Sequence, residues 1–293
     1  MLIGAHVSPA GGLEKAVQRG VERGCQAIQI FNQSPRMWRA RPYAQADVAA
    51  FREALDASPI GAVLIHASYL LNCASEDRDI RAKSLASLTN SLRAGSAIGA
   101  AGVVLHPGSA KGGHAQAAIE RAARTIAEAL AESASSPAGE GCELHLENTA
   151  GAGGTLGRSF EELARLIEGA GGGERLGVCL DSCHLLASGY DIRTPAGMRS
   201  VAARAKRTLG RGRIRSLHLN DSQAPLGSNR DRHANVGQGE LGERGCSAFL
   251  AAPGFARLPC VLETPGAKRE GPSREEVAYA IELRRRALAA RRR

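Results

Sequence analysis

The sequence predicts a closed (β/α)8 barrel, on three observations. Eight short apolar runs each end in or beside a histidine, a carboxylate or an amide, and amphipathic helical segments separate them. Strands that alternate with helices form parallel sheets. The chain of 293 residues is long enough for eight such units, since barrels of this class take about 250 residues. The predicted strands, in chain order, are residues 2–6, 27–32, 62–66, 102–106, 143–148, 177–181, 214–218 and 260–263.

Helical segments occupy the intervals between these strands. Each shows the apolar spacing of an amphipathic helix and is closed by Gly, Pro or Ser. The last helix is predicted to begin at Ser273, where Glu276 completes a capping-box pattern after Gly271 and Pro272. The earlier predicted helices are residues 13–23, 46–57, 84–95, 115–132, 159–168 and 197–209.

Two segments depart from the alternation, and no repeat of fixed period accompanies it. Residues 133–141 are rich in Ser, Pro and Gly and connect a helix to a strand, so we predict a linker on the face that only stabilises the barrel. Residues 220–245 form a long loop on the opposite face and contain Asp231 and His233, so we predict a functional loop. We expect residues 1–293 to form one domain, with a basic helical or frayed tail from about residue 284.

Composition sets limits on the class of protein. With 43% hydrophobic residues the chain can bury a large core without disulfides. Its seven cysteines are odd in number and include no CxxC pair, which indicates reduced thiols and a cytoplasmic location. Met1 leads directly into the first strand, which leaves no room for a secretory signal. No apolar run approaches the roughly 20 residues that span a bilayer.

The net charge of +9 is typical of a protein with a polyanionic partner such as nucleic acid. Six arginines lie in the last ten residues, however, and without them the charge is +9 − 6 = +3. A basic end is often only a solvated or frayed helix terminus. Charge alone therefore leaves both interpretations open. The six are Arg284, Arg285, Arg286, Arg291, Arg292 and Arg293.

Imidazoles and carboxylates at the strand ends predict a metal centre. The carboxyl ends of barrel strands meet at one mouth, so these side chains converge there. One strand-end histidine by itself is more commonly structural, but three carboxylates that face one mouth repel one another unless cations neutralise them. Histidine together with Asp or Glu suits zinc or another borderline divalent ion. The converging residues are His66, His106, Glu147, Asp181, His218 and Glu263.

Three further residues extend this set. His184 follows Asp181 after two residues, a spacing that lets one turn place both beside the same or adjacent ions. Asp231 and His233 alternate, so in an extended segment both side chains face the same way. Nine candidate ligands are too many for one tetrahedral zinc ion. The sequence therefore predicts two or three ions, with at least one bridging carboxylate.

The remaining histidines and one cysteine have other predicted places. His6 ends the first strand and either hydrogen bonds a ligand or phosphate or has no such role. His114 follows a glycine-rich loop and is predicted to be exposed. His145 alternates with Glu147, so we expect it to pack beneath the cluster. Cys183 is predicted to be a small buried residue rather than a ligand.

A cluster of divalent ions is suited to phosphoryl transfer. Such ions lower the pKa of a bridging water, so that a metal-bridged hydroxide can attack, and they neutralise a phosphodiester as its leaving oxygen gains charge. No separate nucleophile is required, and neither a GxSxG elbow nor a GxxxxGK[ST] phosphate loop is present. Glu147, Asp181 and Glu263 are then the candidate catalytic residues.

Seven segments carry a resemblance to a known family: GAHVSPAGGL, HPGS, ENTAG, GVCLDSCH, HLNDS, GSNRDRHANVGQGELG and LETP. Across nearly its whole length the chain resembles endonuclease IV, the zinc-dependent apurinic/apyrimidinic endonucleases (deoxyribonuclease IV). The resemblance implies three Zn²⁺ ions, with Mn²⁺ also accepted at one position. The ligand sets it implies are His66, His106 and Glu147; Glu147, as a bridge, with Asp181, His218 and Glu263; and His184, Asp231 and His233.

The resemblance also implies an activity and a partner. Members of this family act in base excision repair as hydrolases that cut double-stranded DNA 5′ to an abasic site. They leave a 3′-hydroxyl and a 5′-deoxyribose phosphate, and they trim blocked 3′ ends. The damaged nucleotide is turned out of the helix. A cytoplasmic monomer that is associated with the nucleoid during repair is implied, with no membrane partner and no nucleotide cofactor.

Three residues are implied by the resemblance to contact DNA. Arg36 and Trp38 would lie in a loop that enters the minor groove, and Tyr69 would fill the space left by the extruded nucleotide. His6, from its position at the end of the first strand, is a fourth candidate DNA contact, through a phosphate. Without the resemblance, Trp38 is typical of a packed aromatic residue and Tyr69 of a rim residue. Pro35 stands where related enzymes carry a polar inserting residue, which is a departure from the pattern.

Two alternatives belong to other functional classes. A sugar isomerase or epimerase on a related barrel would need about four ligands and a lysine or carboxylate base. The chain has five lysines, none at a strand end, and its third ligand group would have no use there. A nonenzymatic zinc or DNA-binding protein is the other alternative, but an open metal centre at a barrel mouth serves catalysis more readily than structure.

Overall fold

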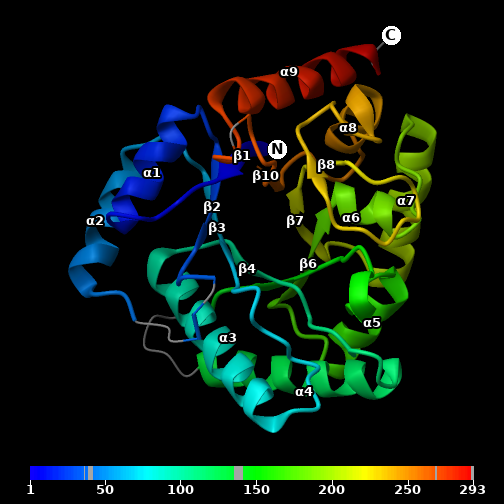
Figure 1. Ribbon diagram of the computed structural model, residues 1–293. Coiled ribbons are helices and arrows are strands. Elements are labelled where there is room, and N and C mark those ends of the chain that lie inside the picture. The colour runs from blue at the N-terminus through cyan, green and yellow to red at the C-terminus, as the bar shows by residue number, and fades with distance from the viewer. Residues whose placement is uncertain (36, 39–41, 135–140, 268, 292–293) are drawn as a thin grey trace.

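Eight parallel strands close into a barrel in the computed structural model (Figure 1), which describes residues 1–35, 37–38, 42–134, 141–267 and 269–291. The predicted fold class is confirmed, and each strand lies within one residue of its predicted ends. Around the barrel the order is β1-β10-β7-β6-β5-β4-β3-β2. The strands are β1 (Leu2–His6), β2 (Ala27–Phe31), β3 (Ala62–His66), β4 (Gly102–Leu105), β5 (Leu144–Glu147), β6 (Leu176–Asp181), β7 (Ile214–His218) and β10 (Pro259–Leu262).

Helices surround the strands, as Figure 1 shows. Helix α3 begins well before the predicted residue 84, because the Asp77 carboxylate accepts hydrogen bonds from the backbone N–H groups of Asp79 and Ile80 and caps an earlier start. Helices α6 and α8 were not predicted. The helices are α1 (Leu13–Glu22), α2 (Gln45–Asp56), α3 (Arg78–Ile98), α4 (Ala115–Ala134), α5 (Phe160–Gly169), α6 (Ser182–Ala187), α7 (Pro195–Leu209), α8 (Gly242–Leu250) and α9 (Arg274–Ala290).

The predicted capping box of the last helix forms only in part. The Ser273 hydroxyl accepts from the Glu276 N–H at 3.3 Å, as predicted. The Glu276 carboxylate accepts instead from the Val236 N–H at 2.9 Å and the Thr264 hydroxyl at 2.8 Å. In a full capping box this carboxylate would accept from the backbone N–H of Ser273, but here it accepts from donors on two other loops. Glu276 therefore connects α9 to the loops at the barrel mouth by hydrogen bonds.

The predicted basic tail is mostly described by the structure, whereas the predicted linker is mostly not. Helix α9 continues to Ala290, so the basic tail is helical that far, while Arg292 and Arg293 lie outside the described residues. Most of the predicted linker, residues 135–140, also lies outside them. No helix in the described part of the chain is long and apolar enough to cross a membrane.

The barrel interior is filled by two kinds of side chain. Leu64, Val104, Cys179 and Val261 form a fully buried apolar cluster, separate from the larger core that includes residues of the surrounding helices. His145 is also buried, with Nδ1 2.9 Å from the Ser216 hydroxyl and Nε2 3.1 Å from a carboxylate oxygen of Glu143. Its ring fits because position 102 is glycine, where a Cβ would lie 2.3 Å from the imidazole.

The seven cysteines are all buried free thiols, which leads to a first prediction. Burial raises the pKa of the Cys25 thiol to about 11 and those of Cys73, Cys142 and Cys260 to about 12. At pH 8 the reactive thiolate is then roughly 100- to 1000-fold scarcer than in an exposed cysteine. We expect Ellman's reagent to titrate fewer than one thiol in the native protein and seven in guanidinium. Rapid modification of the native protein would contradict this.

Candidate metal centre

The nine predicted ligands meet at the carboxyl ends of the barrel strands. They form three groups, and within each group one donor atom per residue lies within 4.8 Å of the others. A fourth group of Asp181, Cys183 and His233 overlaps them, but burial raises the pKa of the Cys183 thiol to about 12, which does not favour a thiolate ligand. The three groups are His66, His106 and Glu147; Glu147, Asp181, His218 and Glu263; and His184, Asp231 and His233.

Glu147, at the end of β5, lies at the centre of this arrangement and is fully buried. One carboxylate oxygen, Oε2, is 2.9 Å from His106 Nε2 and 3.4 Å from His66 Nε2. The other, Oε1, is 3.0 Å from His218 Nδ1. The carboxylate therefore joins the first group to the second.

Charge in the buried cluster is balanced within it. Burial would raise the pKa of the Glu147 carboxyl, but His106 and His218 hold it well below its usual range. Burial would likewise lower the pKa of His184 and of His218, but neighbouring groups, carboxylates among them, raise both pKa values well above the usual range. Protons on imidazoles thus neutralise the carboxylates when no other cation is present. A divalent ion can replace those protons.

The third group is assembled from α6 and the long loop after β7. Within that loop a short antiparallel pair, β8 (Asp221–Ser222) and β9 (His233–Ala234), brings His233 back to the mouth. Asp231 lies between two imidazoles, with Oδ2 3.2 Å from His184 Nε2 and Oδ1 3.1 Å from His233 Nε2. The predicted functional loop therefore does reach the cluster.

Three imidazoles have the orientation that metal binding requires. In each, Nδ1 lies against a backbone carbonyl, which can only accept, so Nδ1 carries the proton and a neutral ring keeps a free lone pair on Nε2. This is the usual arrangement around metal-bound histidines. The pairs are His66 with Ala67 at 2.7 Å, His184 with Asn148 at 2.8 Å and His233 with Glu263 at 3.2 Å.

Three buried polar atoms of the cluster make no hydrogen bond to any described residue: Glu147 Oε2, His184 Nε2 and His233 Nε2. Charged neighbours lie 2.9–3.2 Å from these atoms without forming a hydrogen bond to them. Buried polar atoms without partners are rare in proteins. Divalent cations would satisfy all three, so the residues present fit a metal centre.

Two asparagines orient the ligands, although the sequence pattern predicts no role for them. Asn148 Oδ1 accepts from the Asp181 N–H at 2.7 Å. Asn220 donates from Nδ2 to Asp181 Oδ2 at 2.6 Å and accepts from the Glu263 N–H at 2.9 Å. Asn148 directly follows the strand-end Glu147 in ENTAG, and Asn220 follows the strand-end His218 and Leu219 in HLNDS. This position next to a candidate ligand is the one sequence signal that could have identified them.

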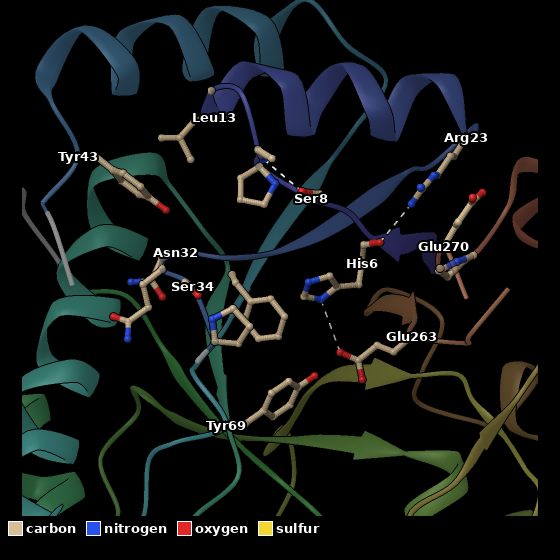
Figure 2. A pocket seen from close by; sticks show the side chains of 18 of the residues that line it. His6, Ser8, Leu13, Arg23, Asn32, Ser34, Tyr43, Tyr69, Glu263 and Glu270 are labelled. Atoms are coloured by element: carbon tan, nitrogen blue, oxygen red, sulfur yellow. Dashed lines mark hydrogen bonds and ion pairs between the residues drawn. The ribbon is translucent and has the colours of Figure 1, made fainter. Parts of the chain in front are cut away.

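A cavity of about 840 Å³ opens beside the cluster (Figure 2). His6 and Tyr69 line it together with Glu263. The His6 imidazole faces Glu263, with Nδ1 3.7 Å from Oε1 and 3.2 Å from Gln29 Nε2. His6 therefore lies beside a candidate ligand without a direct hydrogen bond to it. The cavity thus borders the cluster at Glu263.

The predicted DNA-contact residues lie in different surroundings. Tyr69 is 61% exposed and packs edge-on against Phe31, with ring centroids 5.3 Å apart. Trp38 is partly buried and packs against the hydrophobic core. Arg36 lies outside the described residues. Exposure leaves Tyr69 free to meet a ligand, whereas Trp38 has a packing role whether or not it meets DNA.

Comparison with known proteins gives a consistent result. The family model described as a xylose isomerase-like TIM barrel matches residues 17–286. A probable endonuclease 4 from Methanoculleus marisnigri is 39% identical over 265 residues, which cover 90% of this chain and 93% of the relative. One from Halorhodospira halophila is 42% identical over 264 residues, covering 90% and 88%.

Solved structures distinguish proteins that share only the fold with this chain from those that also share its family. The crystal structure of endonuclease IV from Thermus thermophilus matches with a TM-score of 0.84 and 36% identity over 99% of this chain and 100% of that one. A D-tagatose 3-epimerase-like protein matches with a TM-score of 0.71 but only 17% identity, which reflects the shared barrel alone. On the relatives that are 36–42% identical over most of its length, the chain belongs to the endonuclease IV family.

Proposed function

We propose that this protein is a metal-dependent deoxyribonuclease that hydrolyses DNA at abasic sites during base excision repair. The observation that carries the proposal is the set of nine imidazoles and carboxylates at one barrel mouth in a member of the endonuclease IV family. We further propose cleavage 5′ to the lesion, which leaves a 3′-hydroxyl and a 5′-deoxyribose phosphate, and removal of 3′-blocking groups. Double-stranded DNA that contains these lesions is the proposed substrate.

Each of the three groups would hold one ion, for which we propose zinc. Glu147 would be shared between the first two groups. When bound, the ions lower the pKa of a coordinated water and neutralise the phosphate oxygens. The side chains of His106 and Asp231 are 31% and 44% exposed, whereas Glu147 and His218 are buried. A substrate phosphate would therefore approach over His106 and Asp231, while the buried ligands keep water from the inner side of the centre.

The exposed rim would hold the DNA. Tyr69 lies beside the cluster, 6.3 Å from the His106 ring between centroids, and its exposed face can occupy space left by an extruded nucleotide. Extrusion costs little at an abasic position, which has already lost its base pairing and most of its stacking. His6, at the cavity wall beside Glu263, would meet the sugar–phosphate chain on that side.

The test uses a duplex with one tetrahydrofuran abasic analogue. A nick on the 5′ side of the analogue, absent from the same duplex with a normal nucleotide, is the expected result. Conversion of a ketose to its epimer without nicking would instead support the sugar epimerase alternative. Zinc binding with neither activity would support a nonenzymatic protein.

Metal removal provides a second expected result. Prolonged incubation with a chelator should abolish nicking, because each group loses its cation and the buried carboxylates are again balanced only by protons. Added zinc should restore the rate, and elemental analysis of the restored protein should give about three ions per chain, one for each ligand group. Full activity in metal-free protein, or at most one ion per chain, would refute the proposed centre.

A further inference from the structure

Gln29, in the middle of β2, is a fully buried amide that reaches the metal centre from a strand with no candidate ligand of its own. Its Nε2 donates to Glu263 Oε1 at 2.6 Å and lies 3.2 Å from His6 Nδ1. Its Oε1 lies 2.9 Å from His218 Nε2. Both N–H groups and the carbonyl oxygen thus have partners, as a buried amide requires because burying it without them is strongly unfavourable.

These contacts determine which nitrogen of His218 carries a proton. The amide oxygen can only accept, so His218 Nε2 must donate to it, and a neutral ring then has its lone pair on Nδ1. Nδ1 faces two carboxylates, 3.0 Å from Glu147 Oε1 and 3.3 Å from Glu263 Oε2. A reversed amide would place its oxygen 2.6 Å from the Glu263 carboxylate oxygen, two acceptors with no proton between them, so the contact with Glu263 excludes the reversal.

The arrangement at His218 differs from that at the other three histidines described above. His66, His184 and His233 donate from Nδ1 to backbone carbonyls, so each presents Nε2 to the cluster. His218 presents Nδ1, and a side chain rather than the backbone holds its ring. A backbone carbonyl is present whatever residue occupies the position, whereas this restraint depends on one glutamine.

Gln29 also orients a carboxylate in the same group. Its Nε2 holds Oε1 of Glu263, which leaves Oε2 directed toward His218 Nδ1. One amide thereby determines the orientation of two of the four residues in the group Glu147, Asp181, His218 and Glu263. The strand register supports this. Gln29 in β2 pairs with His6 in the adjacent strand β1, and the next strands around the barrel are β10, which Glu263 follows, and β7, which ends at His218.

We propose that Gln29 is a positioning residue for the metal position held by Glu147, Asp181, His218 and Glu263, where it fixes His218 as an Nδ1 ligand and aims Glu263 Oε2 at the same ion. The inference rests on the proposed metal centre. It assigns Gln29 no contact with the ion or with DNA.

The first test is made on the wild-type protein loaded with zinc. Nitrogen-15 spectra of the histidine rings distinguish a metal-bound nitrogen from one that carries a proton. We expect His218 to be bound through Nδ1 with a proton on Nε2, and His66, His184 and His233 to be bound through Nε2. Binding of His218 through Nε2 would overturn the proposal, and this measurement needs no variant to fold.

The second test is the variant Gln29→Met, which keeps the length of the side chain and removes its donor and acceptor. We expect one of the three ions to bind roughly 10- to 100-fold more weakly, the effect typical of losing a partner that orients a ligand. Competition with a zinc-chelating dye measures this without reference to activity. Gln26→Met is the matched control, because Gln26 is exposed and precedes β2 at the other end of the barrel.

The outcomes separate the two proposals. If Gln29→Met folds and holds all its zinc as tightly as the wild type and Gln26→Met, Gln29 has no positioning role. If the wild type binds zinc with the expected ring nitrogens but leaves abasic DNA intact, the proposed function fails and the role of Gln29 stands. Zinc binding that does not involve His218 at all would overturn both.

Discussion

Replacing Glu147 by glutamine is expected to lower the rate of abasic-site nicking on the order of 1000-fold, the upper range for removing one electrostatic contact from an active site. Glu147 is shared by the first two ligand groups, and it faces imidazoles on both carboxylate oxygens. Glutamine keeps the shape but removes the charge and one of the two acceptor oxygens. The rate should be measured in single turnover on the tetrahydrofuran duplex, beside the zinc content of the variant.

Glu143→Gln is the matched control for this variant. Glu143 immediately precedes the same strand, at the opposite end of the barrel, where its Oε2 lies 3.1 Å from His145 Nε2. The same change of charge there should leave the rate within a few-fold of the wild type. A folded Glu147→Gln protein that nicks as fast as Glu143→Gln would show that the carboxylate is not a shared ligand.

The largest expected loss of stability comes from Asp221→Ala. Asp221 is fully buried and accepts four backbone hydrogen bonds: Oδ1 from Ser222 at 2.7 Å and Leu241 at 2.8 Å, and Oδ2 from Gly239 at 2.9 Å and Gly242 at 3.1 Å. Alanine would leave these N–H groups without their acceptor. We expect the free energy of unfolding to fall by about 3–5 kcal/mol, as when one partner is removed from a buried charged pair.

Equilibrium urea unfolding measures this change, with Asp191→Ala as the control. The Asp191 side chain is 49% exposed, and its one ion pair with a described residue is that with Arg193 at 2.8 Å, so its loss should cost less than about 1 kcal/mol. Asp191→Ala therefore removes the same carboxyl without the buried network. Equal unfolding free energies for the two variants would mean that the loop between β7 and α8 does not depend on Asp221.

The strands and the converging ligands could be predicted because both follow from local pattern and one rule of topology. An apolar run such as AVLIH ends at a histidine, and parallel strands in a closed barrel place all such ends at one mouth. The ligand groups therefore required no knowledge of long-range packing beyond the barrel itself. Their division into three sets came from the family resemblance, and the interatomic distances agree with it.

The residues that orient the ligands could not be predicted in this way. Gln29 lies in AIQIF, and nothing in that run indicates that its side chain crosses the barrel interior to His218. Glu276 has the spacing of a capping box, but its carboxylate accepts a hydrogen bond from the N–H of Val236, which lies far from it in the sequence. Asp181 also caps the unpredicted helix α6, with Oδ1 2.7 Å from the His184 N–H. In each case a tertiary contact overrides or adds to the local preference.

Closure of the barrel between β1 and β10 has a consequence for biosynthesis. A chain synthesised only as far as β7 lacks Glu263 and also lacks the strand on which Leu2–Ala5 pair. The mouth is therefore complete only after β10 and Glu263 have left the ribosome. A ligand that binds only the complete mouth stabilises the closed barrel and not a chain that stops before β10, so binding there favours the copies in which β1 and β10 have paired.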